Sequence, residues 1–73
     1  MQIKNNLAKL IKESPYKREY VQNYVGVSRN TLINWINGKT YPNVPQLLKL
    51  AKLFKVKVEE IYKLEEFDNE EIY

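Results

Sequence analysis

Apolar residues recur at intervals of three and four along most of this 73-residue chain. This spacing predicts amphipathic helices over about residues 2–13, 17–24, 29–37 and 45–54, with a short fifth helix beginning near Val58. The spacing therefore indicates a mainly helical chain with short connections.

Two of the predicted helices, within about residues 18–37, are joined by a tight turn. Gly26 lies where a chain that reverses between packed helices often needs a positive φ. Ser28 suits the N-cap of the second helix, and Gly38 suits its C-terminal stop. Two short helices joined in this way form a helix-turn-helix unit, whose second helix can enter the major groove of DNA.

The second helix of this unit has an apolar stripe and a polar face. Leu32 and Trp35 share the apolar stripe, so Trp35 is expected in the core rather than stacked on a base. Arginine can pair bidentately with guanine and asparagine with adenine, and an aliphatic side chain can touch the thymine methyl group. The residues that we expect to read bases are Arg29, Asn30, Thr31, Ile33 and Asn34.

Several motifs together resemble the XRE (Cro and phage-repressor) helix-turn-helix family. They are Gly-Val-Ser-Arg-Asn-Thr-Leu at 26–32, Trp35, Asn37-Gly38-Lys39, Pro42, the leucine-rich segment 47–54 and Val-Glu-Glu-Ile-Tyr at 58–62. The resemblance implies a compact, all-α, five-helix domain like that of the lambda repressor over residues 1–64. It also implies binding to double-stranded operator DNA, usually as a homodimer, in a bacterial or phage regulator.

Polar side chains flanking the second helix are expected to hold DNA phosphates, which positions a protein without reading sequence. Arg18 stands where the family often has a phosphate-binding glutamine, and Asn37 and Lys39 match family positions that often contact the DNA backbone. The expected phosphate-binding residues are Lys17, Arg18, Ser28, Asn37, Lys39, Thr40 and Tyr41.

Charge is unevenly distributed. Residues 1–57 hold eleven of the twelve basic residues and two acidic ones, a balance of +9, whereas residues 58–73 have a balance of −6. The basic part fits a polyanionic partner. The acidic tail, residues 65–73, has three open interpretations: a frayed terminus, a dimer contact that includes Leu64 and Phe67, or a shield for the basic face.

The composition disfavours several other classes. The chain has no cysteine and no histidine, so we expect no metal, no cofactor and no catalytic residues. No apolar run approaches the roughly 20 residues that span a bilayer, and no signal-peptide pattern follows Met1. We therefore expect a cytoplasmic protein that is not an enzyme.

Two functions from different classes remain. The first is a transcriptional regulator, chiefly a repressor, that occludes a promoter by binding an inverted repeat as a dimer. The second is a protein-binding module, such as an antitoxin or an anti-repressor, that captures a protein partner with the acidic, partly apolar tail.

Overall fold

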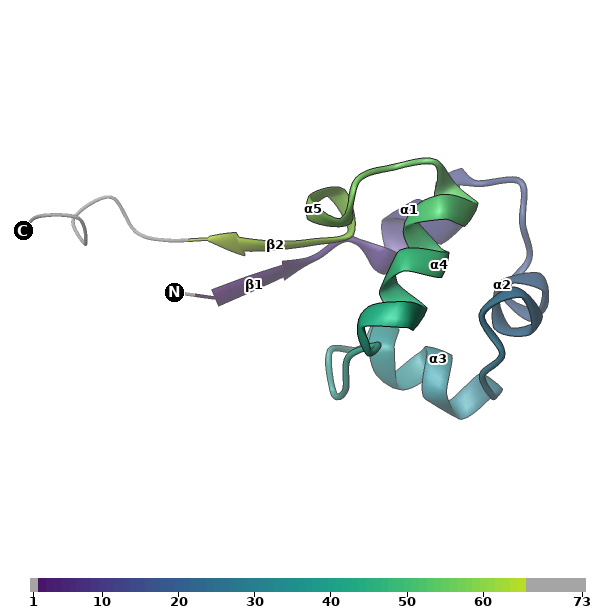
Figure 1. Cartoon of the computed structure of the whole chain (residues 1–73). Coiled ribbons are helices and arrows are strands. Elements are labelled where there is room, and N and C mark those ends of the chain that lie inside the picture. Colours follow the sequence, from purple (N-terminus) through teal and green to yellow (C-terminus); the bar gives the residue numbers. More distant parts are fainter. Residues whose placement is uncertain (1, 66–73) are drawn as a thin grey trace, which may run out of the picture.

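The computed structural model describes residues 2–65, which form five helices and a small two-stranded sheet (Figure 1). The elements are β1 (Gln2–Asn5), α1 (Leu7–Glu13), α2 (Arg18–Val25), α3 (Arg29–Ile36), α4 (Val44–Phe54), α5 (Val58–Ile61) and β2 (Tyr62–Glu65). The expected tail, apart from Glu65 at the end of β2, lies outside the described residues. The prediction of five helices is confirmed, whereas the prediction of an all-α fold is wrong, because the two ends of the described chain pair as strands.

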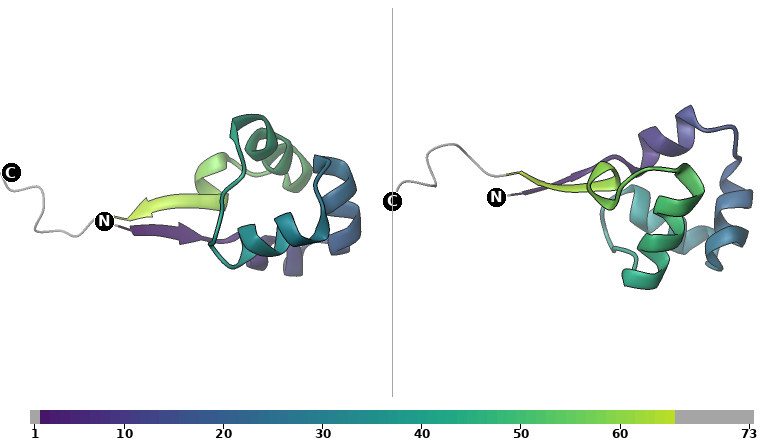
Figure 2. Two further views of the ribbon diagram at one scale, coloured as in Figure 1. Left: turned by 90° about the horizontal axis from the view of Figure 1, so that it is seen from below. Right: turned by 45° about the horizontal axis from the view of Figure 1, so that its top comes forward.

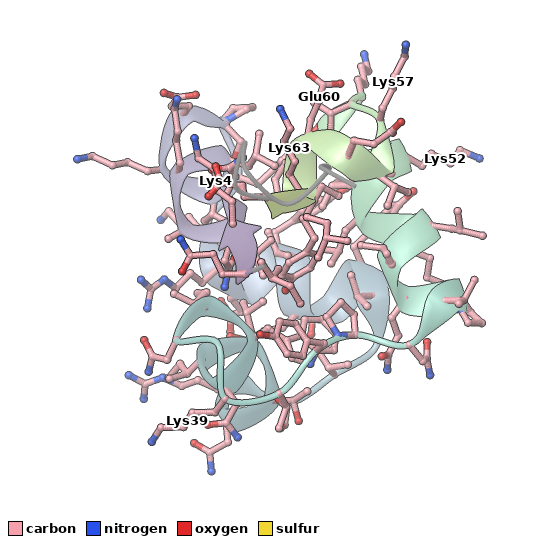
Figure 3. The ribbon with its side chains drawn as sticks, turned by 90° about the vertical axis from the view of Figure 1, so that its left-hand side faces the viewer. Lys4, Lys39, Lys52, Lys57, Glu60 and Lys63 are labelled. Carbon is pink, nitrogen blue, oxygen red and sulfur yellow. The ribbon has the colours of Figure 1, made fainter. Side chains whose placement is uncertain are left out.

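The two strands form an antiparallel ribbon that extends away from the helices in every view (Figures 1 and 2). Ile3 lies opposite Leu64, and Lys4 lies opposite Lys63 (Figure 3). Both apolar side chains are exposed, at 48% for Ile3 and 53% for Leu64. The ribbon therefore belongs to the fold by backbone pairing rather than by burial of its apolar face.

The predicted helix over residues 2–13 is wrong for its first part, because α1 begins at Leu7. The spacing of Ile3 and Leu7 fits a helix, but only Leu7 enters the core. The Oδ1 atom of Asn5 accepts a hydrogen bond from the backbone N–H of Leu7 at 3.0 Å, which marks the change from strand to helix. The partner strand is remote in sequence, so local periodicity gave no sign of it.

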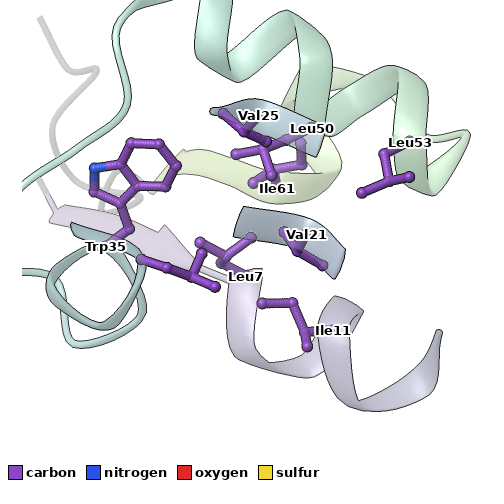
Figure 4. Packing of buried hydrophobic residues seen from close by; sticks show 9 residues of the cluster. Leu7, Ile11, Val21, Val25, Trp35, Leu50, Leu53 and Ile61 are labelled. Atoms are coloured by element: carbon purple, nitrogen blue, oxygen red, sulfur yellow. The ribbon is translucent and has the colours of Figure 1, made fainter. Parts of the chain in front are cut away.

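Nine buried apolar side chains from all five helices form a single core (Figure 4). They are Leu7, Ile11, Val21, Val25, Leu32, Trp35, Leu50, Leu53 and Ile61. Trp35 is 2% exposed, which confirms that it is a core residue. Leu48, on the other side of α4 from this core, is 55% exposed.

Helix α4 begins with a capping box. The Asn43 side chain accepts from the backbone N–H of Gln46 at 2.9 Å, and the Gln46 side chain accepts from the backbone N–H of Asn43 at 2.8 Å. Both bonds satisfy N–H groups that the first turn of a helix leaves free. Helix α4 therefore starts at Val44, one residue earlier than expected, and it ends at Phe54 as predicted.

Candidate nucleic-acid interface

The turn between α2 and α3 depends on Gly26. This residue has φ 87° and ψ 40°, in the left-handed region, as the sequence predicted. The backbone N–H groups of Gly26 and Val27 both donate to the carbonyl oxygen of Gln22, at 2.7 and 2.9 Å. The reversal lets α3 start at Arg29, three residues after Gly26, so α2 and α3 form one packed helix-turn-helix unit.

Ser28 caps the start of α3, as predicted. Its Oγ atom accepts from the backbone N–H of Thr31 at 3.2 Å and lies 3.1 Å from the Thr31 hydroxyl oxygen. Ser28 is exposed and Thr31 is half-buried. The two hydroxyl groups are therefore hydrogen-bonded to each other. Either one can contact DNA only with the donor or acceptor sites that this bond leaves free.

The exposed face of α3 carries most of the expected base-reading residues. Leu32 and Trp35 are buried on the core side. Arg29 and Asn30 are exposed in the first turn, while Ile33 and Asn34 are half-buried in the next turn. Four of the five expected readers thus extend along two successive turns, and the fifth, Thr31, contacts the N-cap residue Ser28.

The chain after α3 folds back over the end of the helix. Gly38 has φ 77°, and the backbone N–H groups of Lys39 and Thr40 donate to the carbonyl oxygen of Asn34 at 2.9 and 3.4 Å. The side chains of Lys39, Thr40 and Tyr41 are exposed. Asn37 is exposed as well, so four expected phosphate-binding side chains lie beside the end of α3.

Tyr41 packs its ring edge-on against Tyr62, with ring centroids 5.5 Å apart and planes at 75°. Burial, with a smaller contribution from Tyr41, raises the pKa of Tyr62 from 10.0 to about 12. Within residues 2–65 the Tyr62 hydroxyl group is buried and has no hydrogen-bond partner. The contact joins the loop after α3 to the first residue of β2.

Lys17 and Arg18 lie at the start of α2, a different element from the loop after α3. Lys17 occupies the N-cap position and Arg18 is the first helical residue, and both side chains are exposed. The expected phosphate-binding residues therefore come from three segments: the start of α2, the N-cap of α3 and the connection between α3 and α4.

Sequence reasoning missed Asn5. Its side-chain N–H donates to the carbonyl oxygens of Trp35 at 2.9 Å and Ile36 at 3.4 Å, at the C-terminal end of α3. The Trp35 carbonyl oxygen also accepts from the backbone N–H of Gly38 at 3.2 Å, so the side chain of Asn5 adds to the hydrogen bonding of the last turn. Asn5, the last residue of β1, therefore fixes the C-terminal end of α3. No local signal in the sequence identifies this contact.

The electrostatics of this region favour an anion. The sequence from residue 20 to residue 58 contains no acidic residue, and within it Arg29 and Lys39 lie at the two ends of α3. Figure 3 shows Lys39 beside α3, at the opposite end of the molecule from Lys52 and Lys57. Lys52 and Lys57 therefore do not lie on the same surface as Lys39.

The described part of the chain offers little for other chemistry. Between residues 2 and 65, no group of three His, Cys, Asp or Glu side chains is placed to hold a metal ion. Over the same residues, no helix has the length and hydropathy to cross a bilayer.

Comparison with known families agrees with the geometry. The profile of the family described as helix-turn-helix matches residues 7–61, which include all five helices. The chain belongs to the XRE-type helix-turn-helix family. No curated protein showed significant similarity to it. Membership in this helix-turn-helix family supports a DNA-binding regulatory domain.

Proposed function

We propose that this helix-turn-helix protein is a sequence-specific transcriptional regulator that represses by occupying an operator as a homodimer. The main support is the exposed face of α3, where Arg29 and Asn30 project from a segment without acidic residues. An exposed, polar helix face of this kind fits the major groove of B-DNA. The protein acts as a binder rather than an enzyme, and we place it in the bacterial cytoplasm.

In this proposal the DNA-contacting residues divide into readers, which lie in α3 and contact bases, and anchors, which lie outside α3 and contact phosphates. Arg29 pairs with guanine, Asn30 pairs with adenine, and Ile33 contacts a thymine methyl group. Asn34 reads a base edge one turn further along the helix, and Thr31 contacts a base from the first turn. The anchors on phosphate are Lys17, Arg18, Ser28, Asn37, Lys39, Thr40 and Tyr41.

The capping of α3 at both ends supports this assignment. Ser28 holds the first turn, and Asn5 and the Asn34 carbonyl group hold the last turn and the following loop. A reading helix that is fixed before binding loses less conformational entropy in the complex. The backbone of α3 and of the loop after it is therefore held in place before the protein meets DNA.

Selection of binding sites from a random DNA duplex pool, at roughly physiological salt, tests the proposal. The expected result is one palindromic motif with half-sites about one helical turn apart. The double variant Arg29→Ala/Asn30→Ala should fold normally and lose the motif, because both side chains are exposed. Salt-sensitive binding without any enriched motif would contradict the proposal and favour the protein-binding module.

A further inference from the structure

An open cleft lies where the ribbon of β1 and β2 meets α1 and α5. Its volume is about 420 Å³, which is in the range of small-ligand sites in proteins. The operator-binding surface proposed above uses none of the residues that line it. The charged residues of the cleft come from all four elements: Lys4, Lys9, Lys63, Glu13, Glu59 and Glu60.

The cleft opens on the face of the ribbon that points away from α3. Side chains alternate between the two faces of a strand, so Lys4 and Asn5 point to opposite faces. Asn5 bonds to Trp35 at the end of α3, so Lys4 and its cross-strand partner Lys63 point the other way. Figure 3 shows Lys4 and Lys63 close to each other and away from Lys39. A ligand in the cleft therefore leaves the exposed face of α3 free.

Two lysines of the cleft form an unfavourable pair. Lys4 lies directly opposite Lys63 in the antiparallel ladder. Directly opposed like charges destabilise a sheet, and a two-stranded ribbon is only marginally stable in water. Lys9, in the first turn of α1, adds a third ammonium group to the same cleft. Three ammonium groups around one opening suit an oxyanion with more than one negative charge, because such an anion attracts all three.

The glutamates of the cleft lie further from the ribbon than the lysines. Glu13 is one helical turn beyond Lys9 on α1, and Glu59 and Glu60 belong to α5. The Glu60 carboxylate accepts from the backbone N–H of Lys57 at 2.7 Å, whereas Glu13 and Glu59 have exposed side chains. An ionised carboxylate only accepts hydrogen bonds, so this end of the cleft suits hydroxyl or amino groups.

We propose that the cleft binds a small phosphate ester that also carries hydroxyl or amino groups, such as a mononucleotide. The phosphate group lies between the ammonium groups of Lys4, Lys9 and Lys63, since lysine binds phosphate as a point charge. The hydroxyl or amino groups face the glutamates at the other end. This inference goes beyond the proposed function and holds whether or not α3 reads DNA.

Binding of the ligand stabilises the ribbon. An anion between Lys4 and Lys63 removes the repulsion across the ladder, and a ligand that binds only the folded chain increases its stability by mass action. Asn5 follows Lys4 and holds the end of α3. The ligand therefore stabilises the strand that carries this contact.

Calorimetric titration of the full chain at low salt, with adenosine 5′-monophosphate as the probe, tests the inference. We expect saturable binding at one site and an increase in Tm. Adenosine and inorganic phosphate should each bind about tenfold more weakly or worse, since each lacks one half of the contacts.

Substitution of the lysines locates the site. The double variant Lys4→Gln/Lys63→Gln should bind adenosine 5′-monophosphate about tenfold more weakly, because it loses two charge-assisted contacts. The matched control is Lys49→Gln/Lys52→Gln, an equal charge change on exposed residues of α4 that do not line the cleft. This control should bind like the wild type.

Substitution of the glutamates distinguishes a specific site from the general attraction of an anion to a basic protein. Glu13→Gln/Glu59→Gln removes two negative charges and leaves the bond between Glu60 and Lys57 intact. General attraction predicts tighter binding of adenosine 5′-monophosphate by this variant. The proposed site predicts binding that is about tenfold weaker, because a neutral amide is a weaker acceptor than a carboxylate.

Four outcomes would overturn the inference: no binding by the wild type, equal affinity for inorganic phosphate, an unchanged affinity of the lysine variant, or tighter binding by the glutamate variant. None of these measurements involves DNA. The inference can therefore fail while operator recognition by α3 stands, and selection of DNA sites can fail while this ligand still binds.

Discussion

The side-chain amide of Asn5 donates a 2.9 Å hydrogen bond to the carbonyl oxygen of Trp35, thirty residues away in the sequence. A second bond, at 3.4 Å, reaches the carbonyl oxygen of Ile36. Trp35 belongs to the core and to α3, while Asn5 ends the strand β1. The contact therefore joins three parts of the molecule: the ribbon, the core and the proposed reading helix.

Replacement of Asn5 should destabilise the fold. Asn5→Ala removes the bonds to α3 and to the N–H of Leu7, and we expect a loss of about 1–3 kcal/mol in the free energy of unfolding by urea. Asn5→Asp keeps the acceptor for Leu7 but sets a carboxylate against the Trp35 carbonyl group, so it should destabilise as well. Asn6→Ala removes a more exposed bond, to the Glu60 carbonyl oxygen at 3.2 Å, and should cost less. A fully stable Asn5→Asp variant would show that the bond to Trp35 contributes nothing.

Gly26 should resist replacement for a backbone reason alone. A Cβ atom at this position would meet nothing within 4 Å, but φ is 87°. Gly26→Ala should therefore cost about 1–2 kcal/mol, from the left-handed conformation. Gly26→Asn should cost less, because asparagine tolerates this region better. Thermal unfolding followed by circular dichroism distinguishes the two variants, and equal stability of Ala and Gly at this position would refute the explanation.

Tyr62 should make stability fall at high pH. Its pKa is raised from 10.0 to about 12 by burial and by Tyr41, so between these values the unfolded chain loses a proton that the folded chain keeps. The stability contributed by the neutral phenol is complete below pH 10 and declines as pH rises towards 12. Tyr62→Phe should remove this part of the decline.

The same variant tests the isolated hydroxyl group. Within the described residues the Tyr62 hydroxyl group has no hydrogen-bond partner, so Tyr62→Phe should be neutral or stabilising at pH 7. Urea unfolding of both proteins at neutral and alkaline pH measures the two effects together. Destabilisation by Phe at pH 7 would reveal a partner for the hydroxyl group, and an unchanged alkaline decline would assign it to other tyrosines.

Loss of a base-reading side chain and loss of a phosphate-binding side chain should change DNA binding in different ways. Arg29→Ala should relax preference at one base pair, with a loss of about 1–3 kcal/mol in discrimination. Lys39→Ala should weaken binding to all sequences alike and reduce the salt slope by about one. Lys52→Ala, at the opposite end of the molecule from Lys39, should change neither quantity. Binding isotherms on matched and mismatched duplexes at several salt concentrations measure both, and identical behaviour of Arg29→Ala and Lys39→Ala would refute the division of roles.

Local chemistry determined much of this protein. Gly26, Ser28 and Gly38 act through their own backbone or through a neighbour within one turn, so the helix-turn-helix and its ends were predictable. The spacing of Leu32 and Trp35 likewise placed them in the core, because a helix repeats every 3.6 residues. The exposed positions of Arg29 and Asn30 follow from the same geometry.

Only the tertiary structure decided the conformation of the two ends of the described chain. Ile3 and Leu7 have helical spacing, yet residues 2–5 form a strand because they pair with residues 62–65. The hydrogen bond from Asn5 to Trp35 is equally non-local. Periodicity reports neighbours within a few residues, whereas these contacts join segments about thirty and sixty residues apart, and they exist only once the core has brought those segments together.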